Sequence, residues 1–198
     1  RNSQAFQDNF DLVLDNPAGC SKRMLDGSAD IGLVPVASIT EIQPKFIFDD
    51  YCIGADQAVR TVKLLSNGTV EELKRIIVDS HSRTSVRLLQ VLCKKLWNVH
   101  VIFEEQSIND LDLDLPSDTG ILAIGDKVFT IEDKFEYSFD LAEEWIKFTK
   151  TDFVFAVWLS KVDLDEQLLK TMKTALSESI SRKESTIDKW SKYDKYRS

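Results

Sequence analysis

The feature that most constrains the fold is a strand, a polar turn and a helix that follow one another within residues 73–96. Residues 73–78 (LKRIIV) end in an apolar run that is typical of a buried strand. The turn of residues 79–85 (DSHSRTS) comes next and carries four hydroxyl side chains. Apolar residues then recur at helical spacing, at Val86, Leu88, Leu89, Leu92 and Leu96. This order predicts a helix that packs on a sheet and begins where a strand ends.

The turn is a candidate site for an anion. We expect its helix to begin near Thr84, where the first backbone N–H groups have no partner inside the helix and the helix dipole is positive. A carboxylate or a phosphate binds well at such a point. The hydroxyls of Ser82, Thr84 and Ser85 can add hydrogen bonds, and Arg83 either assists or points into solvent. The alternative is that Ser82 or Thr84 only caps the helix, and the two roles are compatible.

Strand-like and helix-like segments alternate along the rest of the chain. We expect strands at 10–14, 29–35, 45–53, 59–66, 76–78, 99–103, 120–124 and 153–159, and helices at 17–25, 36–42, 84–96, 141–149, 164–180 and 185–196. This alternation predicts an α/β fold with largely parallel sheets. We interpret residues 59–66 and 153–159 as crossings between two lobes. Lobe one would comprise 1–62 plus 158–198, lobe two 63–157, with a substrate cleft between them.

Composition excludes several classes of function. The 198 residues are 43% hydrophobic and 29% charged, as in an ordinary soluble globular protein, and no apolar run is long enough to cross a membrane. A formal net charge of -8 argues against non-specific binding to nucleic acid. Cys20, Cys52 and Cys93 are odd in number and far apart, so we expect core thiols in a reducing compartment. The acidic stretch 108–118 is expected at the surface. The chain starts at Arg1, and we expect it to lack its true beginning.

Other polar residues follow predicted strands. Gly125 and Asp126 come directly after the apolar run 120–124, where an α/β sheet presents groups to a ligand, although an ordinary turn would look the same. Pro35 and Ser38 follow the strand 29–35 and are expected on the opposite wall of the cleft. His100 is expected within a strand, as a packed or an edge residue.

Six blocks of sequence carry a resemblance to a known family. In chain order they are ADIGLVP, CIGADQAVRTVKLLS, DSHSRTSVRLL, ILAIGDKV, FDLAEEWIKFT and FVFAVW. Together they resemble the chorismate dehydratase family of the futalosine route to menaquinone. The resemblance implies a fold like that of type II periplasmic solute-binding proteins, in which two lobes joined by two crossing strands close on a ligand.

The resemblance also implies an activity and a set of site residues. The activity is a lyase reaction that removes water from chorismate to give 3-[(1-carboxyvinyl)oxy]benzoate, in the cytoplasm and without a metal or organic cofactor. Arg1-Asn2-Ser3 resembles the remnant of a family phrase, so Asn2 is one expected catalytic residue, and Ser85 of the polar turn is the other. The expected substrate-binding residues are Ser3, Pro35, Ser38, Ser82, Arg83, Thr84, Gly125 and Asp126. Asp126 could accept a hydrogen bond from a substrate hydroxyl, but a structural role is favoured for it because an anion beside a dicarboxylate is unfavourable.

Two questions stay open at the level of sequence. The proton leaving the substrate ring could be taken by His81 or by a carboxylate of the substrate itself. The protein could also be a non-catalytic binding protein for a small carboxylate ligand, or a relative that acts on a later intermediate of the pathway. The sequence does not reveal the oligomeric state.

Overall fold

The computed structural model describes residues 4–78, 83–107 and 111–182. The described residues form two compact units, one within 1–14 and 162–198 and the other within 15–161. The smaller unit holds the helices α1 (Gln4–Asn9) and α7 (Glu166–Ser181), which contact each other. Helix α7 begins at the N-cap Asp165, whose carboxylate accepts a hydrogen bond from the Leu168 amide. This confirms the long amphipathic helix expected at 164–180, whereas the expected helix at 185–196 lies outside the described residues.

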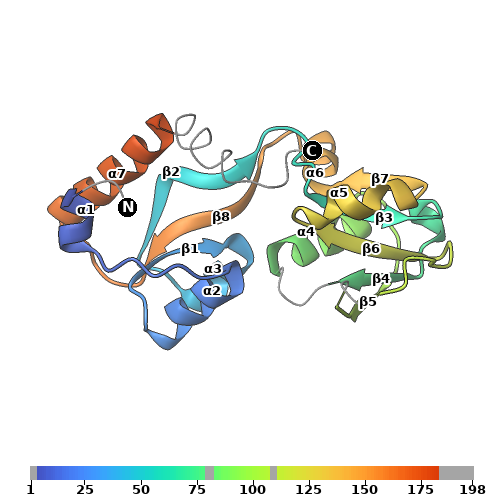
Figure 1. Ribbon diagram of the computed structural model, residues 1–198, viewed down its shortest axis with the longest axis horizontal. Coiled ribbons are helices and arrows are strands. Elements are labelled where there is room, and N and C mark those ends of the chain that lie inside the picture. Colours follow the sequence, from blue (N-terminus) through green and yellow to red (C-terminus); the bar gives the residue numbers. More distant parts are fainter. Residues whose placement is uncertain (1–3, 79–82, 108–110, 183–198) are drawn as a thin grey trace. The chain divides into compact units, whose positions relative to one another are not determined.

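The larger unit contains two sheets (Figure 1). The small sheet has the order β1-β8-β2, formed by β1 (Ile31–Pro35), β8 (Phe153–Ser160) and β2 (Phe46–Ala55). The large sheet has the order β5-β4-β6-β3-β7, formed by β5 (Ile102–Glu105), β4 (Arg75–Val78), β6 (Thr119–Ile124), β3 (Val62–Ser66) and β7 (Tyr137–Asp140).

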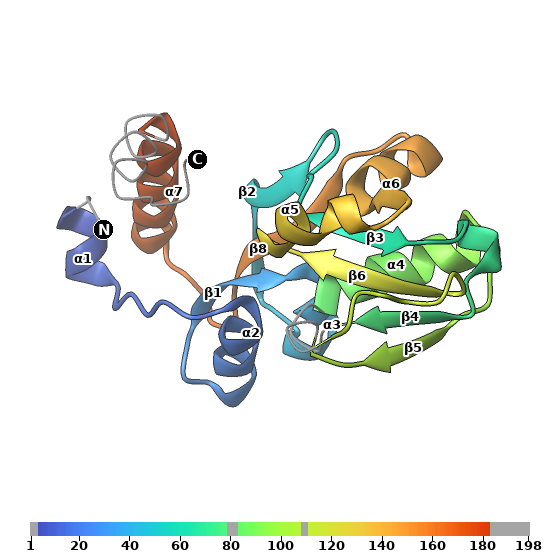
Figure 2. The same ribbon diagram turned by 45° about the vertical axis from the view of Figure 1, so that its right-hand side comes forward.

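The direction of the strands corrects the prediction of largely parallel sheets. Strand β8 is antiparallel to both of its neighbours in the small sheet. In the large sheet β4 is parallel to β5 and β6, but β3 is antiparallel to β6, as the arrows in Figure 2 show. Strand β3 is also antiparallel to β7. Sequence patterns reveal a strand but not its direction, because the direction depends on the side from which the chain re-enters the sheet.

The two sheets are joined by two crossings of the chain. Residues 56–61 lead from β2 in the small sheet to β3 in the large sheet, and α6 (Leu141–Thr149) leads back to β8. Both expected crossing segments contain a strand, β3 and β8. The fold class is therefore α/β, as predicted, with two sheets that are joined by two crossings of the chain. The exact lobe boundaries at residues 62 and 158 stay a prediction.

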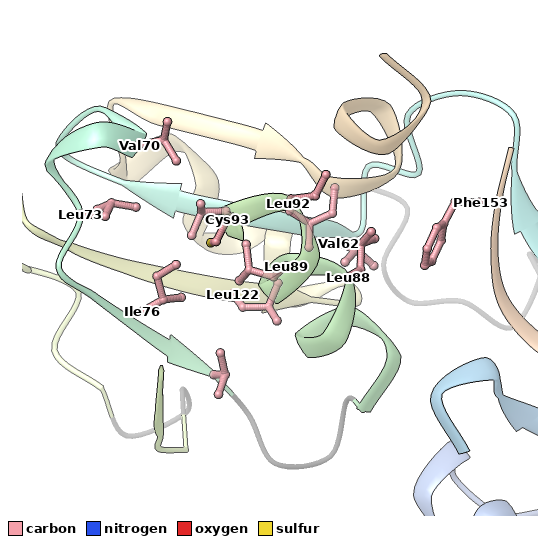
Figure 3. Close-up of a cluster of buried hydrophobic side chains, with 13 residues drawn as sticks. Val62, Val70, Leu73, Ile76, Leu88, Leu89, Leu92, Cys93, Leu122 and Phe153 are labelled. Atoms are coloured by element: carbon pink, nitrogen blue, oxygen red, sulfur yellow. The ribbon is translucent and has the colours of Figure 1, made fainter. Parts of the chain in front are cut away.

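Helices cover both faces of the large sheet. Helix α4 (Arg83–Lys95) packs on one face, where Leu88, Leu89 and Leu92 lie against Ile76 and Leu122 in a buried cluster (Figure 3). The periodic residues that predicted a helix at 84–96 are thus the residues that bury it. Helix α6 lies on the same face.

The opposite face of the large sheet is covered partly by a segment that we expected at the surface. Helix α5 (Lys127–Ile131) packs there together with Leu111, Leu113 and Leu115. These leucines are half-buried and alternate with exposed Asp112 and Asp114. The surface prediction for the described part of 108–118 is therefore wrong for these leucines and right for Asp112 and Asp114. A segment with no regular structure can still bury every second side chain.

Short helices support the small sheet. Helix α2 (Pro17–Asp26) begins at the N-cap Asn16, whose side chain accepts a hydrogen bond from the Gly19 amide, and ends at Gly27 with a left-handed φ of 79°. After β1 the chain forms the 3₁₀ turn η1 (Val36–Ser38) and then α3 (Ile39–Ile42). The 3₁₀ turns η2 (Val70–Glu72) and η4 (Glu132–Lys134) lie in the large sheet's half. The helices predicted at 17–25 and 36–42 are confirmed.

Two local predictions are wrong. Residues 10–14 form neither helix nor strand in the described structure, and Leu12, Val13 and Leu14 are exposed. An apolar run of β propensity becomes a strand only when a neighbouring strand satisfies its backbone. His100 is exposed and precedes β5 rather than packing within it, since that strand begins at Ile102.

The three cysteines differ in environment, which corrects the expectation that all are core thiols. Cys93 is buried, Cys20 is intermediate and Cys52 is exposed. Burial raises the pKa of the Cys93 thiol to about 12, so almost none of it is thiolate at pH 8. A disulfide-exchange reagent at pH 8 should label Cys52 quickly and Cys93 only after denaturant is added. Mass spectrometry of the labelled peptides gives the order, and rapid labelling of Cys93 in the folded protein would contradict the buried position.

Candidate functional site

The candidate site is built around the first turn of α4, which follows β4 in the large sheet. Strands β4, β5 and β6 are parallel, so their carboxyl ends lie along one edge of the sheet, the edge at which α4 begins. The backbone amides of the first helical turn have no acceptor within the helix and carry the positive end of its dipole. Thr84 and Ser85 lie in this turn and are 7% and 4% exposed, so both hydroxyls are shielded from bulk water.

Thr84 connects the large sheet to the small one. Its Oγ1 donates a hydrogen bond to the carbonyl oxygen of Phe155 in β8 at 3.2 Å. The same oxygen accepts a hydrogen bond from the backbone N–H of Ala37 in η1 at 3.4 Å. One hydroxyl therefore joins α4 to two elements of the small sheet's half, and its role in this structure is to hold those elements together.

Arg83 makes a second connection between the same elements. Its Nη1 lies 2.9 Å from Oε2 of Glu41 in α3, and its Nη2 lies 3.1 Å from Oε1. This two-point contact is the geometry in which a guanidinium and a carboxylate interact best. Nη1 also lies 3.4 Å from Oγ of Ser38, a fully buried residue that accepts a hydrogen bond from Ser21. The charge of Arg83 is thus already paired with a protein carboxylate.

The structure brings some of the predicted site residues together. Ser38 and Pro35 from the end of β1 and its following turn lie in the same region as Arg83, Thr84 and Ser85. Ser38 and Pro35 are both buried. Because the positive charge of Arg83 is matched by Glu41, the attraction for an anion here comes mainly from the α4 amides and from neighbouring hydroxyls.

Gly125 and Asp126 lie at the end of β6, on the same edge of the large sheet. Gly125 has a left-handed φ of 74°, and its N–H donates to the carbonyl of Thr61 at 2.8 Å. Asp126 is exposed and precedes α5. The structure shows a tight strand-to-helix turn here, and a role of these two residues in binding stays a prediction.

Four residues of the predicted site lie outside the described residues. They are Asn2, Ser3, His81 and Ser82. Their roles as catalytic, binding or proton-accepting residues stay predictions that rest on the sequence.

The hollow of about 820 Å³ in the large sheet's half lies elsewhere. Polar residues of three loops line it, among them Glu72, Lys74, His100 and Asp118. Several of these groups already have partners: Glu72 completes the capping box of Thr69, and Lys74 pairs with Asp118. Arg75 begins β4 beside this hollow, so it lies at the amino ends of the parallel strands, away from the start of α4.

Sequence reasoning missed two residues that shape the site. Glu41 is the partner of Arg83, but 42 positions separate them and no local pattern links them. Asp140 is 6% exposed, caps α6 through Ala142 and Glu143, and also accepts hydrogen bonds from the amides of Val59 and Arg60 at 3.2 and 2.6 Å. An N-cap at Asp140 could have been read from the sequence FDLAEE, whereas its contact with the 56–61 crossing could not.

Comparison with known proteins decides the family. The sequence model of a menaquinone biosynthesis family matches residues 3–198. The chain belongs to this family. The match confirms the family to which the six sequence blocks pointed, and it gives the protein a role in menaquinone biosynthesis as an enzyme acting on a small molecule.

Solved structures resemble this member of the family in fold. Protein AF1704 from Archaeoglobus fulgidus has a TM-score of 0.66 at 16% identity, over 94% of this chain and 71% of its own. At that identity the likeness shows a shared fold and nothing about activity. An ATP phosphoribosyl transferase complex from Thermotoga maritima matches with a TM-score of 0.42, 15% identity and coverage of 88% and 78%. The substrate binding protein of an amino acid ABC transporter matches with a TM-score of 0.38 and 15% identity, over 94% of this chain and 83% of its own.

Two features are absent from the part of the chain that the structure describes. It contains no cluster of histidine, cysteine and acidic side chains that could hold a metal ion. Nor is any of its helices both long and apolar enough to span a bilayer.

Proposed function

We propose that the protein dehydrates chorismate to 3-[(1-carboxyvinyl)oxy]benzoate. The observation that carries this proposal is the shielded Ser85 on the first turn of α4, beside amides that favour an anion. The family supplies the pathway, and the first turn of α4 supplies a place for a carboxylate. Chorismate carries two carboxylates and a ring hydroxyl, so it offers groups that such a place can hold.

The reaction requires few reactive groups from the protein. A C–H bond and a C–O bond on the ring break, the hydroxyl leaves with a proton as water, and the ring becomes aromatic. No electrons are gained or lost overall. The driving force lies in the substrate, so the protein contributes mainly by orienting it and by stabilising the charge that develops.

Individual residues would have distinct roles in this reaction. Ser85 and the α4 amides would hold one carboxylate, and Asn2 would bond the departing hydroxyl or the carboxylate. The ring proton would go to His81 or to a carboxylate of the substrate. Pro35, Ser38, Gly125 and Asp126 would line the remaining walls, with Ser38 oriented by its bonds to Ser21 and Arg83.

A direct assay tests the proposal. Purified protein incubated with chorismate should form the benzoate product, detected by chromatography and mass spectrometry. If no product forms while chorismate still raises the melting temperature, the protein binds the ligand without acting on it. If chorismate has neither effect, both the reaction and the carboxylate site are wrong.

A further inference from the structure

We propose that Arg83 and Glu41 form a latch that holds the two halves of the larger unit closed over the candidate site. Arg83 is then a positioning residue, and its partner is a carboxylate of the protein rather than of the substrate. The latch itself is independent of which ligand binds. It rests on the proposed function only where chorismate turnover is used to observe it.

The contact has the geometry of a latch because it joins elements from the two sheets at two points. Both outer nitrogens of the Arg83 guanidinium face both oxygens of Glu41, at 2.9 and 3.1 Å. Arg83 is the first residue of α4 on the large sheet, and Glu41 lies in α3, which follows β1 of the small sheet. A planar guanidinium fits a carboxylate in this fixed arrangement better than an ammonium does.

The latch lies beside a second contact of a different kind. Thr84 bonds Ala37 and Phe155 from a buried position, whereas the Arg83 and Glu41 side chains are 41% and 48% exposed. An ion pair at that exposure shifts an equilibrium only by about two- to five-fold and weakens as salt is added. That strength favours closure without preventing the opening that substrate entry and product release require.

The latch changes the role expected for Arg83. While it is closed, Glu41 occupies the two outer nitrogens of the guanidinium, and Ser38 lies against one of them. A substrate carboxylate is then held by the amides and hydroxyls of the α4 first turn. Glu41 also sets the charge of the site, because it cancels the positive charge nearest to that turn.

Amide hydrogen exchange without ligand tests the latch. The N–H of Ala37 donates to Thr84 across the contact, so its exchange rate reports opening. We expect E41Q to raise that rate two- to five-fold at low salt, and 0.5 M NaCl to raise it similarly in the wild type. R83E and E41R should each raise the rate at least as much, and the double variant E41R/R83E should bring it back towards the wild-type value.

A matched control removes a similar ion pair elsewhere. K147Q breaks the half-exposed pairs of Lys147 with Glu143 and Glu144 on α6, and it should leave Ala37 exchange unchanged. Unchanged exchange in E41Q, or a double variant as fast as the single ones, would overturn the latch.

Kinetics with chorismate separate the latch from the proposed function. If the latch sets closure, E41Q should raise KM by two- to five-fold and change kcat by less, and the swapped pair should recover KM. A fall in kcat with KM unchanged would contradict this role for Glu41. If the wild type forms no product, the proposed reaction is wrong, and the exchange experiment still decides the latch.

Discussion

Replacing Ser85 by Ala is expected to lower kcat/KM for chorismate by about 10- to 100-fold. A hydrogen bond to a charged group contributes about 1.5–3 kcal/mol, and each 1.4 kcal/mol is a factor of ten. Ser85 is 4% exposed on the first turn of α4, so water cannot readily replace its hydroxyl there. The measurement is steady-state turnover of chorismate, together with the free energy of unfolding in urea.

Two comparisons show whether such a loss belongs to the site. S179A removes a hydroxyl that bonds the Ala175 carbonyl of its own helix, and it should leave turnover within two-fold of the wild type, roughly the noise of the assay. The double variant T84V/S85A should abolish measurable turnover and cost about 1 kcal/mol or slightly more in stability, on the order of a lost helix cap. If S85A turns over chorismate like the wild type, Ser85 has no catalytic role and only supports the helix.

Replacing Asp140 by Ala is expected to destabilise the protein by about 3–5 kcal/mol, because the loss of this buried carboxylate leaves several backbone N–H donors without an acceptor. The Asp140 side chain accepts hydrogen bonds from four backbone N–H groups, those of Val59, Arg60, Ala142 and Glu143. Arg60 also has a left-handed φ of 65°, so the bond that fixes its amide holds an unfavourable backbone conformation. Urea denaturation followed by circular dichroism measures the change.

The charge and the shape of Asp140 can be separated. D140N keeps an N-cap acceptor and should cost about 1–2 kcal/mol, less than the alanine variant. D133A replaces an exposed carboxylate of the neighbouring η4 turn and should change the free energy of unfolding by about 0.5 kcal/mol at most. A cost below about 1 kcal/mol for D140A would mean that Asp140 does not anchor the crossing at residues 56–61.

Features that depend on neighbours in sequence were predictable. The helix α4 followed from apolar residues spaced by three and four, and the same residues fill the core against Ile76 and Leu122. Pro17 near the first position of α2 and Gly27 just after its end marked the two ends of this helix. In each case the residues that predict the helix lie within one or two helical turns of each other in the sequence.

Features that depend on distant partners were not predictable. Residues 10–14 have the composition of a strand and are not one, because the described structure gives them no strand partner. The segment with Leu111, Leu113 and Leu115 was expected at the surface. These leucines pack on the face of β3 and β6, and the local sequence does not show which face of a sheet a segment will cover. The antiparallel pairing of β8 with β1 and β2 could not be predicted from local sequence either, because it depends on how the chain returns from the large sheet.

By itself the sequence determined the family, the α/β class and the helix α4, and it predicts that the first turn of α4 favours an anion. These depend on residue types and spacings that act over a few positions. Only the tertiary structure decided that Thr84 bonds Ala37 and Phe155 and that Arg83 is paired with Glu41. The reason is that the chain crosses twice between its two sheets, so residues 42 or more positions apart become neighbours through packing that no local pattern records.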